Sequence, residues 1–543
     1  VMTFKNKQID YTRYCANNQL CFPMDTFTII PQDDPVLLLN AFVEGLDLSK
    51  LYQAYSRFGR IEYSPKVLLK ILLFGYMRKI YSSYELRRAC EENTKFMYLL
   101  EGLPPPSEST ICRFRRNCMS EYGEDLLVQM VRKLEVAGLL SFENVFIDGT
   151  KMEANANRYS FVWRKTTKKN YEKLQAKMQE CLPELLRAEH IRYTLPKEVS
   201  SRNLSNVLKK LHKKKQQEKV EFVYGTGTRK TTLQRTIETV EGWLERLEKY
   251  EKAFAVFRGR NSFSKTDPDA TFMHMKEDHM RNGQLKPGYN VNAAVASGFI
   301  IGNYISPDRS DIATLIPFSE KLLKHYKIQN VVVDSGYESE ENYTYYENLA
   351  DTELWVKPSN YEQQKKRKYK NDISRKENMD YDEIEDIYYC VAGKPLFNVQ
   401  SKWERTNTGY LRETTIYECP SCHGCPLKEQ CIRSRSKVPL EERNKRIYVS
   451  KAFQKHRKEM LQKIATTKGK ILRVNRSIQA EGQFAVIKED MQFRRFMLRG
   501  EGKVEAEWLL LSMAYNLLKL DHKLKKGRLG AGLIIPSTFP AGL

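Results

Sequence analysis

The chain has 543 residues, more than one hydrophobic core usually organises, so we expect several domains or one fold with large insertions. A hydrophobic fraction of 41% and an aromatic fraction of 11% exclude a largely disordered chain. Ninety Lys and Arg against 67 Asp and Glu give a net charge of +23, which favours nucleic acid as the partner. An anionic membrane surface is the weaker alternative, because no apolar run approaches the roughly 20 residues of a membrane span.

The first residues predict a reducing compartment, which bears on how the cysteines are interpreted. The first residues lack the apolar stretch and cleavage site of a signal peptide, so we expect a cytoplasmic, nucleoid-associated protein without structural disulfides. Four of the 11 cysteines fall close together, and these four alone resemble a site. No Gly-rich segment completes a nucleotide-binding motif, so neither ATP nor NAD is expected.

Residues 1–140 are predicted to form a helical DNA-binding domain. One helix begins at Pro65, a second runs from Ser82 or Ser83 to about Gly102, and a third begins after Ser107. The third helix suits helix-turn-helix recognition of a major groove through three arginines, Arg113, Arg115 and Arg116. A solvated basic face is the alternative for these arginines.

The next segments predict strands that end in acids. Residues 141–163 begin a core with a short buried strand that ends in Asp148 and turns at Gly149, and residues 164–262 form a basic helical insertion. Residues 263–356 resume the core with a strand pair turning at Ser297 and Gly298, a helix, and an apolar strand ending in Asp334.

Polar composition predicts a second, cysteine-rich insertion over residues 357–470. Residues 471–525 then complete the core with a helix that carries Glu481 and a strongly apolar helix suited to covering a sheet. Residues 526–543, rich in Gly and Pro, are predicted to be a flexible tail.

Asp148, Asp334 and Glu481 are the candidate catalytic acids. Open sheets place their sites at the carboxyl ends of strands, so the two aspartates can converge. Carboxylates suit two Mg²⁺ or Mn²⁺ ions, which activate an attacking oxygen and stabilise a leaving one. Each acid alone is a weak signal, since an Asp before Gly often forms a turn and a Glu on a basic helix often forms an ion pair.

The order of several segments along the chain supports the choice of these three acids. VFIDGTKMEANANR, GYNVNAAVASG, VVVDSGYESEEN and the helix from NRSIQAEGQF onward resemble bacterial insertion-sequence transposases of the DDE type, over about residues 63–520. The resemblance implies an α/β ribonuclease H-like catalytic core with a helical N-terminal DNA-binding domain and two insertions. Six residues separate Glu481 from Lys488, as in the family's Glu-x6-Lys pattern.

The family's Arg stands four residues before the Glu, but position 477 here is Ser, and Arg476 lies one place off. The family's Tyr, three residues before that Arg, is missing as well, because Arg473 precedes Arg476 by three. At α-helical spacing Glu481, Phe484 and Lys488 share one face and are expected to face DNA. Arg476 is a further candidate for DNA contact. So are Arg494, Arg495 and Arg499, for which a solvated basic face is the alternative.

A second candidate site is a set of four cysteines, Cys419, Cys422, Cys425 and Cys431. Two short pairs in one loop favour a structural Zn²⁺ held by four thiolates. The alternatives are an iron–sulfur cluster or a metal-free reduced loop, and His423 is a substitute for one cysteine. Cys390 is expected to be a small buried hydrophobe rather than a fifth ligand.

The sequence therefore predicts a DNA transposase that cuts the ends of its element and joins them to target DNA. Its partner is double-stranded DNA, with a homodimer in the DNA complex. Two alternatives stay open: a metal-dependent DNA nuclease without strand transfer, and an inactive DNA-binding descendant of a transposase.

Overall fold

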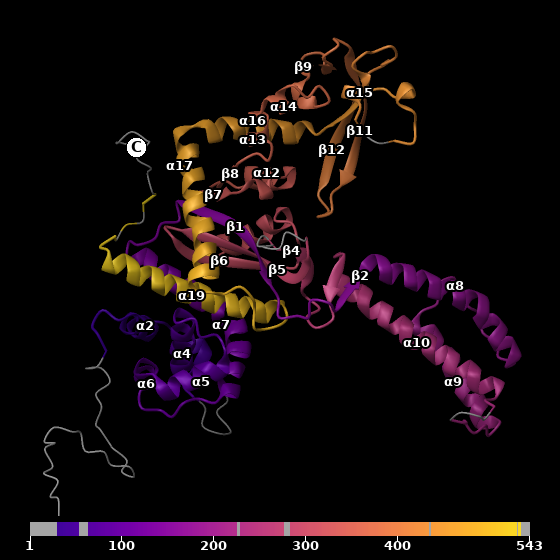
Figure 1. The fold of residues 1–543 in the computed structure, drawn as a ribbon, viewed down its shortest axis with the longest axis horizontal. Helices are drawn as coiled ribbons and strands as arrows, with labels where there is room; N and C mark the ends of the chain where they lie inside the picture. The colour runs from indigo at the N-terminus through magenta and orange to yellow at the C-terminus, as the bar shows by residue number, and fades with distance from the viewer. Residues whose placement is uncertain are drawn as a thin grey trace, which may run out of the picture.

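The computed structural model describes residues 30–53, 63–224, 229–275, 283–433, 436–528, 530 and 532–533. The beginning of the chain and most of the predicted tail lie outside these ranges. The protein is a mixed α/β structure in which a central sheet carries a helical arm and a separate, mostly β module (Figure 1). No helix of the described ranges is long and apolar enough to cross a membrane.

The central sheet has six strands in the order β4-β5-β1-β7-β8, with β6 also paired to β5. Its antiparallel half joins β5 to β1, β4 and β6, whereas β1, β7 and β8 run parallel. The strands are β1 (Asn144–Glu153), β4 (Thr271–His274), β5 (Leu285–Ala296), β6 (Phe299–Ser306), β7 (Asn330–Val333) and β8 (Glu353–Val356). The predicted turn at Ser297 and Gly298 is confirmed, and both residues have the positive φ of a tight hairpin.

Helices cover both faces of this sheet, because the buried strands are apolar on both sides. On one face, Val145 and Ile147 join the large core that contains α11 (Leu315–Leu323) and α19 (Glu501–Lys525). On the other face, Phe146 packs with Leu472 of α17 (Thr467–Arg476). Asp148 has the parity of Phe146 along the strand, so its side chain belongs to the α17 face.

The N-terminal helices pack beneath α19 and share its core (Figure 1). They are α2 (Pro35–Glu44), α3 (Ser49–Gln53), α4 (Pro65–Met77), α5 (Ser83–Glu92), α6 (Thr94–Leu100) and α7 (Glu108–Val136). The predicted second helix is two helices, because Asn93 ends α5 and caps α6 through a bond from the Lys95 amide. The predicted short recognition helix is the first part of the 29-residue α7.

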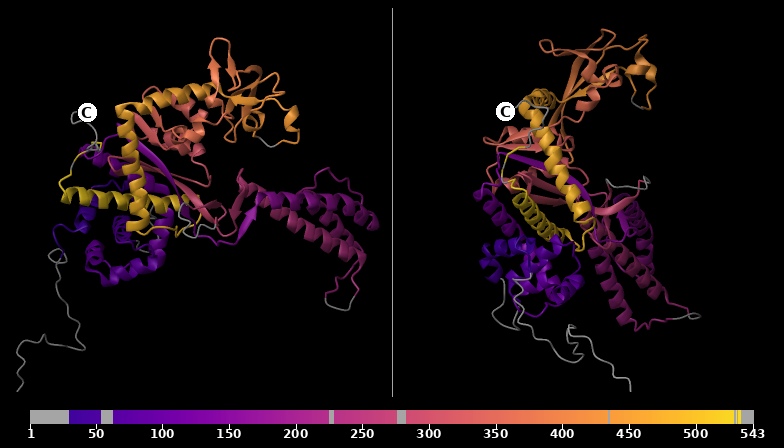
Figure 2. Two further views of the ribbon diagram at one scale, coloured as in Figure 1. Left: turned by 45° about the horizontal axis from the view of Figure 1, so that its top comes forward. Right: turned by 60° about the vertical axis from the view of Figure 1, so that its left-hand side comes forward.

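The residues predicted to form the first insertion build a basic arm that projects from the sheet (Figure 2, left). Its stalk pairs β2 (Phe161–Trp163) with β3 (Ser262–Ser264), and its body is α8 (Arg164–Ala188), α9 (Ser201–Gln217) and α10 (Thr232–Phe257). Leucines of these three helices form a hydrophobic cluster of their own, separate from that of the sheet. The arm therefore has a self-contained core.

Residues 361–449 form the cysteine module, built on a five-stranded antiparallel sheet in the order β13-β12-β11-β10-β9. Its strands are β9 (Asp380–Asp382), β10 (Ile387–Tyr389), β11 (Pro395–Arg405), β12 (Leu411–Glu418) and β13 (Arg446–Val449). Its short helices are α13 (Tyr361–Gln364), α14 (Arg367–Lys370), η3 (Lys376–Asn378), α15 (Lys428–Cys431) and η4 (Leu440–Glu442). The chain then returns to the sheet through α16 (Lys451–Ala465), which contacts β8. The expected boundary at residue 470 falls inside the next helix, α17.

The corner between α16 and α17 needs a glycine. A Cβ on Gly469 would lie 2.5 Å from the carbonyl oxygen of Lys463, which is closer than real side chains approach. The tight crossing turns α17 across the sheet, where it contacts β1 and β7 (Figure 1).

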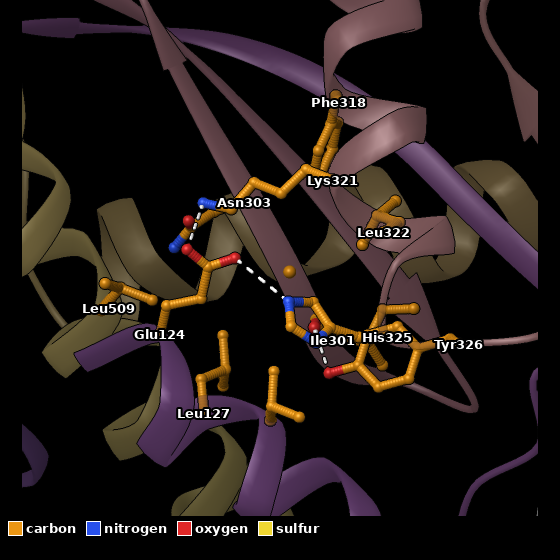
Figure 3. Close-up of a pocket in the computed structure, with 12 residues that line it drawn as sticks. Glu124, Leu127, Ile301, Asn303, Phe318, Lys321, Leu322, His325, Tyr326 and Leu509 are labelled. Carbon is orange, nitrogen blue, oxygen red and sulfur yellow. Dashed lines mark hydrogen bonds and ion pairs between the residues drawn. The ribbon is translucent and has the colours of Figure 1, made fainter. Parts of the chain in front are cut away.

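A small cavity lies where α7 meets β6 and α11 (Figure 3). Its volume of about 10 Å³ leaves room for at most one water. Lys321 lies between Glu124 of α7 and Glu505 of α19, at 3.2 and 2.6 Å. The phenol of Tyr326 donates to the carbonyl oxygen of Ile301. These contacts identify the cavity as part of the joint between the N-terminal helices and the sheet rather than as a ligand site.

Candidate active site

Four charged side chains from three parts of the chain meet beside the sheet. One guanidinium nitrogen of Arg476 lies 2.6 Å from Glu481 Oε1 and 3.7 Å from Asp334 Oδ1, and the other lies 3.8 Å from Asp148 Oδ2. The side chains of Asp334 and Glu481 are 44% and 51% exposed, whereas those of Asp148 and Arg476 are 11% and 14% exposed. The three predicted acids thus border one site, which is open to solvent on the side of Asp334 and Glu481.

Asp148 lies in the middle of β1 and not at its end, so the predicted turn at Gly149 is wrong. Parallel pairing with β7 stops at Ile147, but antiparallel pairing with β5 continues to Glu153, which keeps the strand extended. Gly149 is needed for space: a Cβ there would lie 3.0 Å from the phenol oxygen of Tyr337 and from Asp311 Oδ1.

Asp334 follows β7 directly, as the apolar run predicts, and begins the short helix η2 (Ser335–Tyr337). Tyr337 ends this turn and is buried behind the acids, where its hydroxyl donates to Asn292 Oδ1 at 2.6 Å. Burial, with the charges of Asp311 and Asp148, raises the pKa of Tyr337 well above its ordinary value, so the phenol stays a donor.

Sequence reasoning missed the polar layer beneath the acids. Asn292 also accepts from Thr314, and Asn290 donates to Asp311 Oδ1 at 2.6 Å. The signal was present in GYNVNAAVASG, because polar residues alternate along an otherwise apolar buried strand. Such a residue needs a partner, and a paired layer holds the strands and the start of η1 (Ile312–Thr314) in fixed register.

The helix that carries Glu481 contains two π-helical turns, η5 (Ser477–Glu481) and η6 (Val486–Asp490), separated by α18 (Gly482–Ala485). The extra residue in each turn changes which side chains share a face. Phe484 is buried against Trp508, and Lys488 is 8% exposed and donates to Thr150 Oγ1 at 2.8 Å. The expectation that both residues face DNA beside Glu481 is therefore wrong, because Phe484 packs into the core against α19 and Lys488 bonds to β1.

The prediction that Arg115 contacts DNA is also wrong. It is 2% exposed, and its guanidinium donates to the carbonyl oxygen of Tyr81 and to the hydroxyl of Ser83, so it joins α7 to the start of α5. Its neighbours Arg113 and Arg116 are exposed on α7 and stay candidates for DNA contact.

Of the three further arginines predicted to contact DNA, two bind the loop that follows β1. Arg495 donates to the carbonyl oxygens of Ala154 and Ala156, and Arg499 donates to that of Asn155. Arg494 pairs with Glu489. All three are exposed, so a contact with DNA stays a prediction for them.

The four cysteines lie together at the end of the module, all with free thiols. The amide of Lys445 donates to the Cys422 sulfur at 3.3 Å, and burial raises the pKa of Cys419 to about 11. Cys390 is half-buried and packs against the cluster that contains Cys419 and Cys422.

Over the ranges that the structure describes, no group of three or more His, Cys, Asp or Glu side chains has a geometry that would hold an ion. The donor chemistry at the acids nevertheless fits a hard divalent cation, because three carboxylates already surround one positive charge. At the cysteines, the donor types fit zinc but their arrangement gives it no support.

Two families match the chain. The family described as Transposase DDE domain matches residues 389–521, and the one described as Transposase domain (DUF772) matches residues 25–117. The first match contains Glu481, the four clustered cysteines and Cys390, but neither Asp148 nor Asp334. No curated protein and no solved structure matches the chain.

Proposed function

We propose, for a chain that belongs to the DDE transposases of insertion sequences, that it cuts the ends of its element and joins them to target DNA. The observation that carries the proposal is the meeting of Asp148, Asp334 and Glu481 around Arg476. A sheet of antiparallel strands continued by two parallel ones, with Asp148 in β1 and Asp334 directly after β7, supports a ribonuclease H-like core.

Asp148, Asp334 and Glu481 would hold Mg²⁺ or Mn²⁺, which when bound supplies activation of the attacking oxygen and charge stabilisation at the leaving oxygen. The chain itself positions the three carboxylates. β1 and β7 fix the two aspartates, because both are central strands of the sheet. The more exposed Glu481 borders the open side, where a DNA backbone would enter.

Two displacements at phosphorus make up the proposed reaction. First, the oxygen of a water forms a bond to phosphorus at the element end while the bond to the 3′-oxygen breaks, leaving a 3′-hydroxyl. That hydroxyl then attacks a phosphodiester of the target strand, so one bond to phosphorus forms as another breaks. Both displacements use the same acids.

The test begins from the second displacement. A pre-cleaved element end with a 3′-hydroxyl, mixed with plasmid and Mg²⁺, should give covalently joined DNA. Changing Asp148, Asp334 or Glu481 to Ala should lower joining by roughly 100-fold or more, while binding of the end in EDTA stays within about threefold.

The matched control is Glu489→Ala, which removes an exposed acid of the same helix that pairs with Arg494. It should join at a rate within a few-fold of the unchanged protein. Cutting without joined product, at saturating bound end, would favour the nuclease, and binding without either reaction would favour the inactive descendant.

A further inference from the structure

Arg476 has an unusual environment for a residue expected to grip DNA. Its side chain is 14% exposed and lies between three carboxylates that come from β1, the end of β7 and its own helix. Its Nη1 is buried and has no hydrogen-bond partner among the described residues, since Asp148 Oδ2 is 3.8 Å away. The guanidinium therefore acts on the acids and not on the outer surface.

The π-helical turn η5 explains how Arg476 reaches this place. In an α-helix, residues four apart share a face, whereas residues five apart do not. A π turn uses one more residue, so Arg476 and Glu481, five apart, come onto one face and pair at 2.6 Å. The one-residue offset in the sequence is thus cancelled by one extra residue in the helix.

Position 477 faces outward instead. Ser477 is exposed, although its short hydroxyl reaches Glu481 Oε2 at 2.9 Å. An arginine at this position would extend into solvent beyond Glu481 and away from the two aspartates. The linear spacing of the family signature therefore selects the wrong residue in this chain.

We propose that Arg476 is the internal counter-ion of the acid site, held there by the π turn, and that it competes with divalent cations for the three carboxylates. The proposal rests on the proposed function for the identity of the site as a metal site. Arg476 is a positioning residue in this scheme: it keeps three like charges together before a cation binds and must give way when one does.

The consequence is a rise in metal affinity when the arginine charge is removed. A unit positive charge within about 4 Å of the ligands opposes a divalent cation, so its loss should tighten binding by about fivefold to tenfold. This gain would accompany slower joining, because the acids lose the group that orders them.

The experiment measures Mn²⁺ binding by calorimetric titration of the full chain without DNA. Arg476→Gln should bind Mn²⁺ about fivefold to tenfold more tightly than the unchanged protein, and Arg476→Lys, which keeps the charge, should stay within about twofold. Thermal unfolding of each variant in EDTA checks that it is folded.

Two register variants separate the π turn from the linear signature. The exchange Arg476→Ser with Ser477→Arg moves the charge to the signature position and should bind Mn²⁺ as Arg476→Gln does. Deleting Ile478, a 45% exposed residue of η5, should convert the turn to α-helix, restore a spacing of four, and leave Mn²⁺ affinity near that of the unchanged protein.

Equal or weaker Mn²⁺ binding by folded Arg476→Gln would overturn the counter-ion proposal. An exchange variant that behaves like the unchanged protein would overturn the register argument. If Asp148→Ala leaves Mn²⁺ binding unaltered, the proposed metal site itself fails, which is a different result from failure of Arg476 alone.

Discussion

Gly149 limits the space behind the acids. It follows Asp148 on β1, and the positions around its missing side chain are taken by Tyr337, Asp311 and Asn292, all within 3.2 Å of an added Cβ. These neighbours are themselves tied by hydrogen bonds, so they have little freedom to move. The glycine thus couples the backbone of Asp148 to the polar layer beneath it.

Gly149→Ala should therefore damage the site more than the fold. The added methyl would push Tyr337 and the backbone of Asp148 apart by a few tenths of an ångström, at a cost of about 1–3 kcal/mol in unfolding free energy. Joining of a pre-cleaved end should fall at least about tenfold, since small misplacements of reacting groups are costly. Joining assays and thermal unfolding measure the two effects.

The matched control is Gly242→Ala, in the middle of α10 of the arm. Nothing lies within 4 Å of an added Cβ at this position. Alanine in a helix interior is favoured over glycine by roughly 0.5–1 kcal/mol, so this variant should be as stable or more stable and should join normally. Equal losses from both substitutions would contradict the role given to Gly149.

The meeting of the three acids was predictable from the sequence, but the surroundings of several other predicted site residues were not. The resemblance selects Asp148, Asp334 and Glu481, and the structure brings these three side chains to one site. Arg115 looked like its exposed neighbours, and its burial depends on α5, which lies elsewhere in the sequence. The burial of Phe484 and Lys488 depends on Trp508 and Thr150, which lie on other elements, so the spacing within one helix does not anticipate it.

Elements with a strong local signal were predicted well. The hairpin of β5 and β6, the strand β7 and the buried helix α19 follow from tight-turn residues or continuous apolar runs. Predictions failed where contacts between distant segments determine an element. β1 continues past Gly149 because β5 pairs with it, and the 29-residue helix α7 packs against α19, β6 and the other N-terminal helices.

The cysteine module is the element whose chemistry is still a prediction. Its core contains few residues, among them Tyr388, Leu396 and Tyr417, so a structural metal would add stability that the core does not supply. If the four cysteines hold zinc, elemental analysis should find one zinc per chain, and each of Cys419→Ser, Cys422→Ser, Cys425→Ser and Cys431→Ser should lose it.

Cys181→Ser, in the arm, is the matched control and should keep the metal, because this half-buried thiol lies in α8. Cys390→Ser should also keep it; loss there would make Cys390 a ligand and contradict its interpretation as a packing residue. Iron with a visible absorption band, or no metal in freshly purified protein, would replace the zinc prediction.

At the scale of the whole molecule, the N-terminal helices and the central sheet share one core. They bury a single continuous cluster around α19, and Tyr81 donates to the carbonyl oxygen of Met491 just after η6. This bond joins the segment between α4 and α5 to the end of the helix that carries Glu481. The arm, by contrast, meets the sheet through its β2–β3 stalk and keeps its own core.

Charge is concentrated in the arm. Residues 164–260 contain 24 Lys and Arg and 12 acids, so this segment holds a surplus of 12 positive charges out of the net +23 of the chain. Some are neutralised locally, as Lys214 is by Glu189 at 2.7 Å, but Lys209 and Lys213 of α9 are exposed. Salt weakens DNA binding in proportion to the number of phosphates that a protein neutralises. We therefore predict that the exposed lysines of the arm contribute a measurable share of the affinity for DNA.

Replacing residues 164–261 by Asn-Gly should remove that share and leave the rest folded, because Trp163 and Ser262 are paired neighbours in the stalk and a two-residue turn can join them. The arm-deleted protein should bind element ends more weakly, and the slope of log affinity against log salt should become shallower by about 0.9 for each phosphate that the arm neutralises in the full chain. A double substitution tests two exposed lysines of the arm within the full chain. Changing Lys209 and Lys213 to Gln should make the slope shallower by up to about 1.8, the value for two phosphates. The control Lys173→Gln, on α8, tests whether any lysine of the arm has this effect. Fluorescence anisotropy over a range of salt concentrations measures the slopes, and thermal unfolding verifies the fold. An unchanged slope in the arm-deleted protein would mean that the arm does not bind DNA, and its positive charge would then need another partner.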